Sequence, residues 1–350
     1  MERIIKKQNK LYPESEMADW FKLFYQSEFG NAHIPEDRNS NFIALKDEIE
    51  DKKSNKADIE DIGNGNVRVH LGHLKKIGLS QELFVEIMMQ SRLLSKGTRE
   101  GFSDKVKALE KAVKESSLPI TEEEFYTFKE SYYAAGCRLI SHSERYKEAY
   151  NPSYRVIRAE YANKMKLWAK VEKLQNEAKI NGTTVNIAID GKSSAGKTYL
   201  ADMFSGIFDC NIIHMDDFFL QNHQRTIERL LQPGGNVDYE RFQKEVIPNL
   251  KSPVEFTHHT YDCQTNVISE KKICAKTLNI IEGAYSMHPY FGDIYDLCIF
   301  MDIDKETQFK RILKRNGELY KRFTNRWIPL ENEYIENFKI KEQCDFIFKA

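Results

Sequence analysis

Residues 191–198 (GKSSAGKT) constrain the fold of this chain more than any other segment, because they satisfy the pattern G-x-x-x-x-G-K-[ST] at every fixed position. The segment also stands where the pattern requires it, after the apolar run VNIAID and before a helical run. Its two glycines let the backbone turn tightly, so that successive N–H groups point inward at phosphate oxygens. A turn without a ligand would give no reason for the Lys-Thr pair. The sequence therefore predicts a strand–loop–helix unit that binds a nucleoside triphosphate.

Two side chains of this loop have predicted roles of their own. The ammonium of Lys197 is expected to reach the β- and γ-phosphates, and the hydroxyl of Thr198 is expected to bind Mg²⁺. The helix that begins near Lys197 adds the positive end of its dipole. We therefore predict ATP and Mg²⁺ as cofactors, held by Gly191, Lys192, Ser193, Ser194, Ala195, Gly196, Lys197, Thr198 and Tyr199.

The sequence around the loop alternates short apolar runs with helical patterns over residues 183–350. The apolar runs are VNIAID, NIIHM, LNIIEG, LCIFMDI and DFIF, and the helical patterns include KTYLADMFSGIF, ERFQKEVIPNL and KETQFKRILKRNG. Such alternation is typical of βαβ units and of a mostly parallel sheet covered on both faces. We therefore predict an α/β fold, a P-loop NTPase domain, for residues 183–350.

The part of the chain before this domain has a different pattern. Residues 1–155 show mainly helical periodicity, as in QELFVEIMMQSRLLSKG, and Thr121 with Glu124 forms a capping-box pattern. The charge-rich residues 47–66 predict a short helix followed by a loop. Residues 156–182 form a charged amphipathic segment, which predicts a helix connecting the two domains.

Composition disfavours several classes of protein. Lys plus Arg total 52 against 53 for Asp plus Glu, whereas a general nucleic-acid binder normally shows a basic excess or stripe. No apolar run approaches the roughly 20 residues that span a bilayer, and no apolar segment follows the basic start as in a secretory signal. The six cysteines form no CxxC pair. We therefore expect a cytoplasmic protein without a nucleic-acid or membrane partner, and a homo-oligomer stays open.

Three fates of the γ-phosphate compete: transfer to a small molecule, hydrolysis in a switch protein, and hydrolysis in a mechanical ATPase. Residues 55–58 (NKAD) match the base-reading motif NKxD of GTPases, but they lie upstream of the loop with no apolar strand before them. A mechanical ATPase would have an apolar strand ending in Asp-Glu, whereas the best candidate here ends in Ile281, Glu282 and Gly283. Both hydrolytic alternatives are therefore disfavoured.

Transfer to a small molecule has candidate residues. The apolar run NIIHM is followed by Asp216 and Asp217, two acids at the carboxyl end of an expected strand, where ligands bind in open α/β sheets. A carboxylate beside the acceptor hydroxyl orients it and takes its proton as the phosphoryl group transfers. Capping of a helix N-terminus is the alternative role, and it applies best to Asp217.

Over about 165 residues of its C-terminal half, the chain resembles the uridine kinase and phosphoribulokinase group of P-loop kinases. The matching pieces occur in the order of that family: IAIDGKSSAGKT, HMDDFF, PGGNVDYERF, HTYDCQT, LNIIEGAYS and DLCIFMDIDKETQFKRILKRNG. The resemblance implies an enzyme that transfers the γ-phosphate of ATP to a hydroxyl of a small nucleoside-like or sugar-like acceptor.

The resemblance also assigns roles to residues. It implies that Asp216 is the general base and that Glu282 lies by Mg²⁺ and its waters. The other implied residues line the acceptor pocket or belong to a lid over the phosphates: Asp217, Tyr261, Asp262, Arg311 and Arg315. Further basic candidates near the lid are Arg322 and Arg326.

Two positions depart from the pattern of that family. Phe219 stands where the family usually has a tyrosine, and no basic residue follows Tyr261 and Asp262 until Lys271. A site built to hydrogen-bond a polar group loses much of its selectivity when the partners are missing. Both departures therefore predict that uridine and cytidine are poor acceptors.

The first half carries two polar clusters without a recognised motif, residues 28–33 (EFGNAH) and residues 142–146 (HSERY) with the nearby Tyr150, Tyr154 and Arg155. The second cluster is a candidate site for a small anionic or hydroxylated ligand, and ordinary tyrosines of a helical domain are the alternative. Dimerisation, acceptor specificity and regulation are the expected roles of this half. For the whole chain, the alternative to a kinase is a nucleotide-dependent regulator with little or no phosphotransfer.

Overall fold

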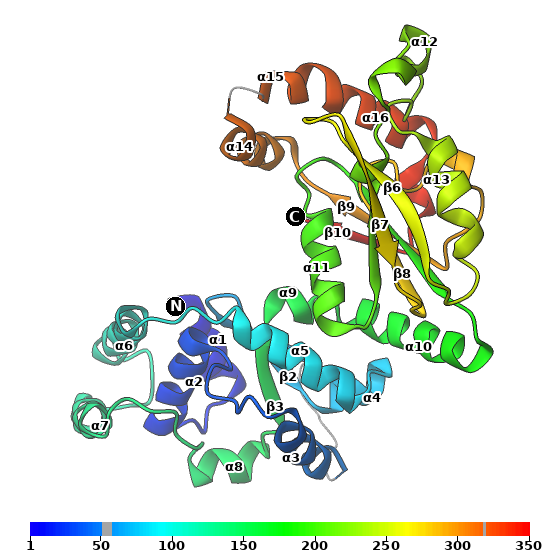
Figure 1. Cartoon of the computed structure of the whole chain (residues 1–350). Helices are drawn as coiled ribbons and strands as arrows, with labels where there is room; N and C mark the ends of the chain where they lie inside the picture. Colours follow the sequence, from blue (N-terminus) through cyan, green and yellow to red (C-terminus); the bar gives the residue numbers. More distant parts are fainter. Residues whose placement is uncertain (51–57, 318–319) are drawn as a thin grey trace. The chain divides into compact units, whose positions relative to one another are not determined.

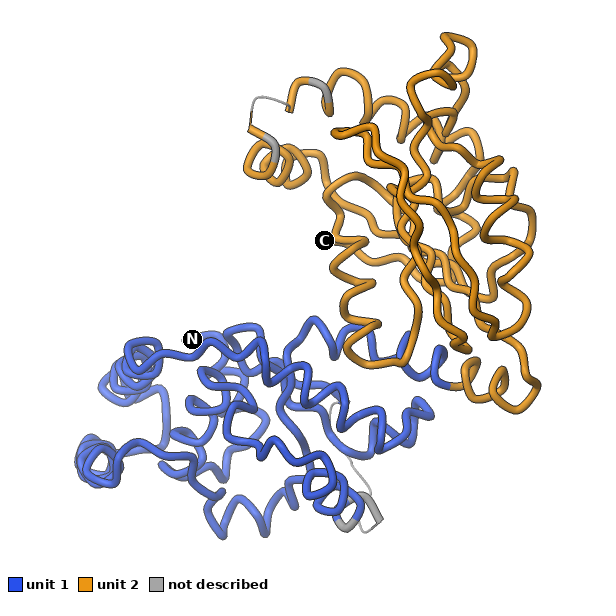
Figure 2. The backbone as a smooth tube through the Cα atoms, in the orientation of Figure 1, with its two compact units in different colours: residues 1–172 blue, residues 173–350 orange. Residues whose placement is uncertain are grey.

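The computed structural model describes residues 1–50, 58–317 and 320–350, and the chain forms two compact units (Figure 2). Unit 1 is Met1–Glu172 and unit 2 is Lys173–Ala350. The boundary falls inside helix α10 (Met165–Asn181), so this helix contributes residues to both units. Residues 55–57 of the GTPase-like NKAD segment lie outside the described residues.

The segment before unit 2 differs from the single helix predicted over residues 156–182. Its start belongs to strand β3 (Tyr154–Arg158), and the short helix α9 (Ala159–Ala162) precedes α10. Val156 and Ile157 are both buried, and β-branched side chains suit a packed strand. The apolar residues of β3 are followed by apolar residues at helical spacing in α10. The change from strand spacing to helix spacing is therefore not visible in the sequence.

Unit 1 is mainly helical, as predicted, and also contains a small antiparallel sheet (Figure 1). Strands β1 (Ile59–Gly63), β2 (Asn66–His70) and β3 pair in that order. Asn64 and Gly65 join β1 to β2 with positive φ angles of 54° and 70°, as an Asn-Gly hairpin turn requires. The helices before α9 are α1 (Glu2–Leu11), α2 (Met17–Phe29), α3 (Arg38–Glu50), α4 (Gly72–Ile77), α5 (Gln81–Leu93), α6 (Arg99–Lys114), α7 (Glu122–Ala134) and α8 (Glu144–Tyr150).

The core of unit 1 lies around helix α2, whose apolar side chains pack against α6. Phe21 is fully buried, and its ring lies 6.3 Å from that of Phe102 on α6. Phe102, Val106 and Leu109 are buried at the spacing of one helix face. The capping box predicted for Thr121 and Glu124 is present at the start of α7, where it satisfies two backbone N–H groups.

A buried polar network links the sheet of unit 1 to its helices. Arg68 on β2 is 2% exposed, and its Nε and Nη2 donate to Oε1 of Gln26 at 3.0 and 2.8 Å. Its guanidinium also lies 3.7 Å from the carboxylate of Glu60 and over the ring of Tyr154. Glu60 accepts a further hydrogen bond from the hydroxyl of Tyr12 at 2.7 Å. The buried charges are therefore paired and hydrogen-bonded, as an apolar interior requires.

His142, from the second polar cluster of the first half, extends this network. Its Nδ1 lies 2.6 Å from Oδ1 of Asp19, and its Nε2 lies 2.6 Å from the hydroxyl of Tyr154. Burial lowers the pKa of His142 to about 4, so the neutral ring donates to Asp19 and accepts from Tyr154. Tyr146 stacks on the same ring at 4.0 Å. This part of the cluster therefore belongs to the internal framework of unit 1.

In the described residues, unit 2 is built on a five-stranded parallel sheet in the order β10-β9-β4-β8-β5. Every residue of β4 and β8 is buried, which is the pattern of a parallel sheet covered on both faces. The predicted α/β fold with a parallel sheet is thus confirmed. The strands are β4 (Val185–Gly191), β5 (Asn211–His214), β8 (Leu278–Glu282), β9 (Leu297–Asp302) and β10 (Phe346–Lys349).

Helices cover this sheet on both sides (Figure 1). α11 (Lys197–Ile207) lies on one face, and α13 (Tyr239–Glu245) and α16 (Ile328–Asn337) lie on the other. On that second face, Phe242 and Tyr334 share a core with Phe300 of the sheet. The remaining described helices are α12 (Ile227–Leu230), α14 (Lys305–Asn316) and α15 (Tyr320–Arg322).

A separate two-stranded hairpin, which the sequence analysis did not predict, stands beside the main sheet. Its strands are β6 (Phe256–Asp262) and β7 (Val267–Ile273), paired in antiparallel register. β7 is mostly exposed and reads VISEKKI, so no apolar period marks it. The buried ring of His258 stacks on Phe218 at 5.1 Å, and this contact attaches the hairpin to the segment that follows β5.

The parallel strands deliver several chain segments to one edge of the sheet. β4 leads into the loop of residues 191–198, β5 ends at His214, and β8 ends at Glu282. The register pairs Glu282 with Ile189 on one side and with His214 on the other. Since the carboxyl ends of parallel strands face the same way, these three segments meet at a single site.

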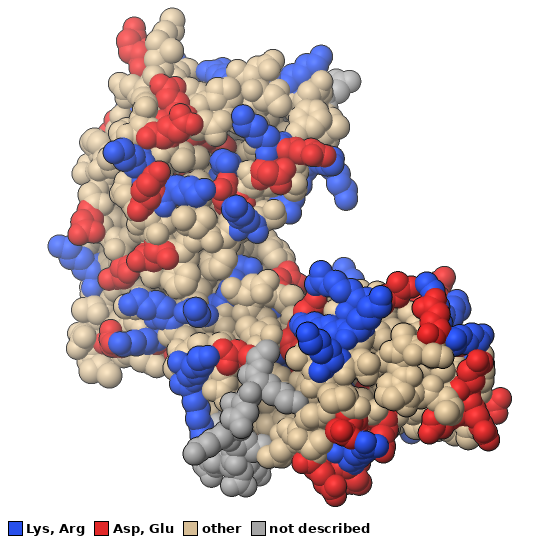
Figure 3. Space-filling view, turned by 180° about the vertical axis from the view of Figure 1, so that it is seen from behind, with Lys and Arg blue, Asp and Glu red and all other residues tan. Residues whose placement is uncertain are grey.

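The surface shows no dominant sign of charge on the face drawn in Figure 3, where acidic and basic side chains occur on both units. None of the helices in the described residues is long and apolar enough to cross a membrane.

Candidate nucleotide-binding and phosphoryl-transfer site

Both fixed glycines of the loop are explained by geometry. Gly191 has a φ of +135°, and a Cβ there would collide with the carbonyl oxygen of Met301 on β9. At Gly196 the nearest atom to such a Cβ is 4.0 Å away, but its φ of +94° is a conformation that L side chains rarely adopt. One glycine therefore permits a close approach to β9, and the other permits the turn into α11.

Side chains from β9 and α14 hold the loop from outside. The Nζ of Lys192 donates to Oδ1 of Asp302 at 2.7 Å. Gln308 and Arg311 donate to the carbonyl oxygens of Ser193 and Ser194, each at 3.0 Å. The bonds from Gln308 and Arg311 occupy carbonyl oxygens of the loop, while the first turn of α11 keeps N–H groups that no intrahelical acceptor satisfies. The loop is thus arranged to present donors to an anion.

Lys197 is positioned by the loop itself. Its Nζ donates to the carbonyl oxygens of Gly191 at 2.8 Å and Lys192 at 3.1 Å. An ammonium has three N–H donors, so two of them fix its position and the third is left for a phosphate oxygen.

Thr198 and Glu282 form a pair of oxygen donors beside Lys197. The hydroxyl of Thr198 lies 3.2 and 3.4 Å from the two carboxylate oxygens of Glu282. A hydroxyl and a carboxylate are the hard ligands that Mg²⁺ takes together with phosphate oxygens and waters, so the pair fits that cation. Within the described residues, no group of three His, Cys, Asp or Glu side chains is placed to hold a metal ion.

His214 is a site residue that the sequence analysis missed. Its Nδ1 lies 2.6 Å from Oε1 of Glu282, and this hydrogen bond raises the pKa of His214. The signal was its position at the end of β5, two residues before Asp216. It orients the carboxylate that faces Thr198, as partners of metal-binding carboxylates commonly do.

Asp216 lies in a short 3-10 turn, Met215–Phe218, directly after β5. Its side chain is open to solvent. Surrounding protein atoms nevertheless raise the pKa of Asp216, Glu282 raises it further, and Lys197 opposes the shift. The carboxylate is therefore accessible and lies within electrostatic reach of the residues expected to hold the nucleotide.

Asp217 does not cap a helix, which was the alternative role considered for it. His214 occupies the cap position of the 3-10 turn, and the carboxylate of Asp217 lies 3.1 Å from Nζ of Lys271 on β7. The ion pair places Lys271, the first basic residue after Tyr261 and Asp262, directly beside Asp217.

Tyr261 and Asp262 lie at the end of β6, where they organise the hairpin turn. The hydroxyl of Tyr261 donates to Asn266 at 2.7 Å, and its side chain is 5% exposed. Asp262 accepts from the backbone N–H of Gln264 and the hydroxyl of Thr265, which lower its pKa. Since these polar groups are used within the turn, their placement gives the acceptor-pocket prediction no support.

The predicted lid residues lie on or after α14. Arg311 contacts the loop through Ser194, and Arg315 follows four residues later on the same helix face. Arg326 is exposed in a π-helical turn, Phe323–Trp327, and the side chain of Arg322 lies outside the described residues. Tyr199, the last predicted nucleotide-binding residue, is 47% exposed on α11. The lid stays a prediction.

Three further residues at the loop were missed from the sequence. Asp190, buried before Gly191, accepts hydrogen bonds from the N–H of Met287 at 3.0 Å and from the hydroxyl of Tyr334 at 2.8 Å. Tyr334 lies on α16, and Glu331 lies on the same face of that helix. Glu331 accepts a hydrogen bond from the N–H of Ser193 at 2.9 Å. No motif marks α16, and Glu331 follows Ser193 by 138 residues, so only the fold reveals these contacts.

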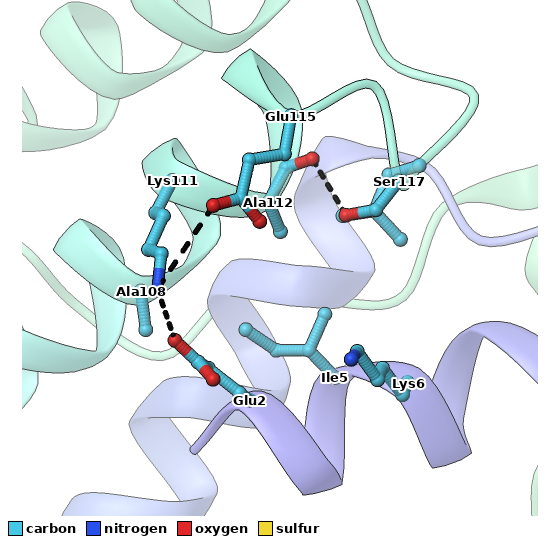
Figure 4. A pocket seen from close by; sticks show the side chains of 9 residues that line it. Glu2, Ile5, Lys6, Ala108, Lys111, Ala112, Glu115 and Ser117 are labelled. Atoms are coloured by element: carbon cyan, nitrogen blue, oxygen red, sulfur yellow. Dashed lines mark hydrogen bonds and ion pairs between the residues drawn. The ribbon is translucent and has the colours of Figure 1, made fainter.

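A hollow in unit 1 has none of these features (Figure 4). It lies between α1 and α6, and Lys111 bridges it with contacts to Glu2 at 2.7 Å and Glu115 at 3.9 Å. All three side chains are mostly exposed, so these are surface ion pairs of small energetic weight. We assign no function to this hollow.

No family model matches the chain, and no curated protein matches it. Among solved structures, a possible uridine kinase from Bacillus stearothermophilus is 18% identical with a TM-score of 0.37, over 51% of this chain and 99% of that one. A putative fructose transport system kinase from Silicibacter sp. TM1040 is 17% identical with a TM-score of 0.40, over 47% and 90%. Shikimate kinase from Bacteroides thetaiotaomicron is 17% identical with a TM-score of 0.29, over 47% and 86%.

Each of these structures covers about half of this chain, and likenesses this remote add nothing to the description of the site. The class of the unit follows from its own structure, since a parallel sheet with a phosphate-binding loop after β4 defines a P-loop nucleotide-binding fold.

Proposed function

We propose that unit 2 binds ATP with Mg²⁺ and transfers the γ-phosphate to a hydroxyl of a small molecule. The observation that carries this proposal is the placement of Asp216, an accessible carboxylate at the sheet edge that also holds Lys197, Thr198 and Glu282. A site for nucleotide binding alone has no need of a solvent-accessible base next to the phosphates. A transferase does, because the acceptor hydroxyl has to lose its proton.

The side chains have distinct roles in this proposal. Lys197 balances charge on the phosphates, and Thr198 with Glu282 would hold the cation. When bound, Mg²⁺ neutralises charge that develops on the phosphate oxygens. Asp216 orients the acceptor hydroxyl and takes its proton, and its raised pKa makes it a stronger base than an ordinary carboxylate.

The acceptor is expected to be nucleoside-like or sugar-like, with uridine and cytidine poor substrates. Phe219 brings no hydroxyl to the site, and its backbone pairs with Val237 in an isolated bridge. The ion pair of Asp217 and Lys271 lies next to Asp216 and offers a charged partner to polar groups of the acceptor.

The test uses purified full-length protein and a panel of metabolites, with acceptor-dependent ADP release as the readout. Asp216→Asn should lower turnover by about 10²–10⁴-fold, the usual worth of a general base, while the affinity for Mg²⁺–ATP stays close to that of the wild type. Asp202→Asn, an exposed aspartate of α11, is the matched control and should keep full turnover. Lys197→Ala should also lose turnover, because the charge on the phosphates is then no longer balanced by the ammonium.

The same measurements separate the kinase from the alternative regulator. If the wild type binds nucleotide but no metabolite stimulates ADP release, the regulator is favoured. If a metabolite stimulates release and Asp216→Asn releases ADP as fast as the wild type, Asp216 is not the base.

A further inference from the structure

A carboxylate from α16 lies on the loop that is expected to bind phosphates. The N–H of Ser193 donates to Oε2 of Glu331 at 2.9 Å, and the hydroxyl of Ser193 donates to Oε1 of the same group. Glu331 is 6% exposed, so its negative charge is held inside the protein and against the loop.

The fold holds this carboxylate in place through a second contact of the same helix. Tyr334, three residues after Glu331, is 1% exposed and donates to Asp190 at 2.8 Å. Asp190 in turn accepts from the N–H of Gly191 at 2.6 Å. α16 therefore contacts Asp190, just before the loop, and Ser193 within it, and the position of Glu331 is set by a helix packed into the core.

This arrangement conflicts with the binding of a triphosphate. A nucleotide brings several negative charges to the loop, and like charges at short range in a partly buried site repel each other strongly. A buried carboxylate is also costly by itself. The two donors of Ser193 relieve that cost only as long as no phosphate displaces the carboxylate.

We propose that Glu331 acts as an internal anion that occupies part of the phosphate cradle in the nucleotide-free protein, and that a bound nucleotide has to displace its carboxylate from Ser193. α16 is then the element that responds to an occupied loop. The inference rests on the proposed function, because it presumes that the loop binds a nucleotide.

The charged and titratable groups around Glu331 belong to different segments of unit 2. Lys197 favours its ionised form, whereas burial and the charge of Asp190 raise the pKa of Glu331. Tyr285, after β8, also lies within electrostatic reach of Glu331. Protonation of Glu331 removes the competing charge, so the competition should weaken as pH falls.

The test compares the wild type, Glu331→Gln and Glu333→Gln by calorimetric titration with Mg²⁺–ATP, Mg²⁺–ADP and adenosine. Glutamine keeps an acceptor for Ser193 and loses the charge, so Glu331→Gln should bind Mg²⁺–ATP about tenfold more tightly. The gain should be smaller for Mg²⁺–ADP and absent for adenosine, which carries no phosphate. Glu333 is exposed on the same helix, and its variant should bind all three ligands as the wild type does.

A pH series adds a second readout. The ratio of the two affinities, Glu331→Gln over wild type, should shrink as pH falls, because protonation of Glu331 in the wild type removes the competing charge. Equal or weaker binding of Mg²⁺–ATP by a folded Glu331→Gln protein would overturn the inference. If that variant fails to fold, Ser193→Ala removes one of the two donors and should tighten ATP binding in the same direction.

These outcomes are distinct from a failure of the proposed function. Absence of nucleotide binding in all three proteins would refute the nucleotide site and the inference with it. Binding of equal strength in all three would refute the role of Glu331 alone.

Discussion

At the scale of single residues, Asp302 shows how one carboxylate fixes the phosphate loop. It ends β9 and accepts hydrogen bonds from Nζ of Lys192 at 2.7 Å and Nζ of Lys341 at 2.8 Å. Burial alone would raise the pKa of Asp302, but the two lysines outweigh it and lower the pKa to about 2. The ionised carboxylate is therefore a stabilising part of the site at neutral pH.

Asp302→Asn should consequently destabilise unit 2 in a pH-dependent way. A depressed pKa means that the stabilisation is fully present above the unfolded value, near 3.8, and is lost as pH falls through about 2. The loss at pH 7 should be on the order of 1 kcal/mol, after allowance for solvent screening. Urea unfolding of both proteins should show a constant difference from pH 7 to pH 5 and a narrowing one below pH 4. A difference that grows on acidification would contradict this assignment.

At the scale of elements, a buried polar network links the helices and the sheet of unit 1 in addition to apolar packing. The network of Arg68, Glu60, Gln26 and Tyr154 joins β1, β2 and β3 to α2. Removing one member of a buried pair leaves the other charge without compensation, which costs far more than loss of a surface pair.

Arg68→Met should therefore destabilise unit 1 by roughly 3–5 kcal/mol, because Glu60 stays buried without its cation. Arg145→Met is the matched control, since Arg145 pairs with Glu14 at the exposed surface, and it should change the thermal midpoint very little. The measurement is thermal unfolding followed by circular dichroism, with nucleotide binding as the check on unit 2. Equal midpoints for the two variants would show that the network is not a determinant of stability.

At the scale of the whole molecule, the chain joins a mainly helical unit to a P-loop unit through α10, which contributes residues to both. Gln175 of this helix donates to the carbonyl oxygen of Asp209 in unit 2. A fragment that represents unit 2 therefore has to keep the complete helix.

Residues 164–350 alone should bind Mg²⁺–ATP with an affinity close to that of the full chain, because every contact described for the loop lies within unit 2. We expect unit 1 to help define the acceptor, so the fragment should phosphorylate the true acceptor poorly and should leave uridine and cytidine unmodified. The measurement is ADP release by fragment and full chain with the same acceptors. Efficient phosphorylation of uridine by the fragment would contradict both expectations.

The sequence by itself determined those parts of the protein whose physical cause is local. The loop of residues 191–198 needs glycines because of its positive φ angles and its close approach to β9. The buried parallel strands need unbroken apolar runs, so both features were predictable from the sequence. The hairpin turn at Asn64 and Gly65 also carried a local signal, the Asn-Gly pair itself. The charge-rich residues 47–66 were nevertheless predicted to form a short helix and a loop. Strand β3 was missed because its apolar residues continue the stripe of the following helices.

Only the tertiary structure decided which distant residues meet. The order of residues along the chain does not reveal the strand register that brings His214 and Thr198 into contact with Glu282. It also does not reveal the packing of α16 that brings Glu331 to Ser193. These contacts depend on how the parallel strands align and how the helices pack on the sheet. They join side chains up to 138 residues apart, and the free energy that selects them comes from burial of the whole core rather than from any one segment.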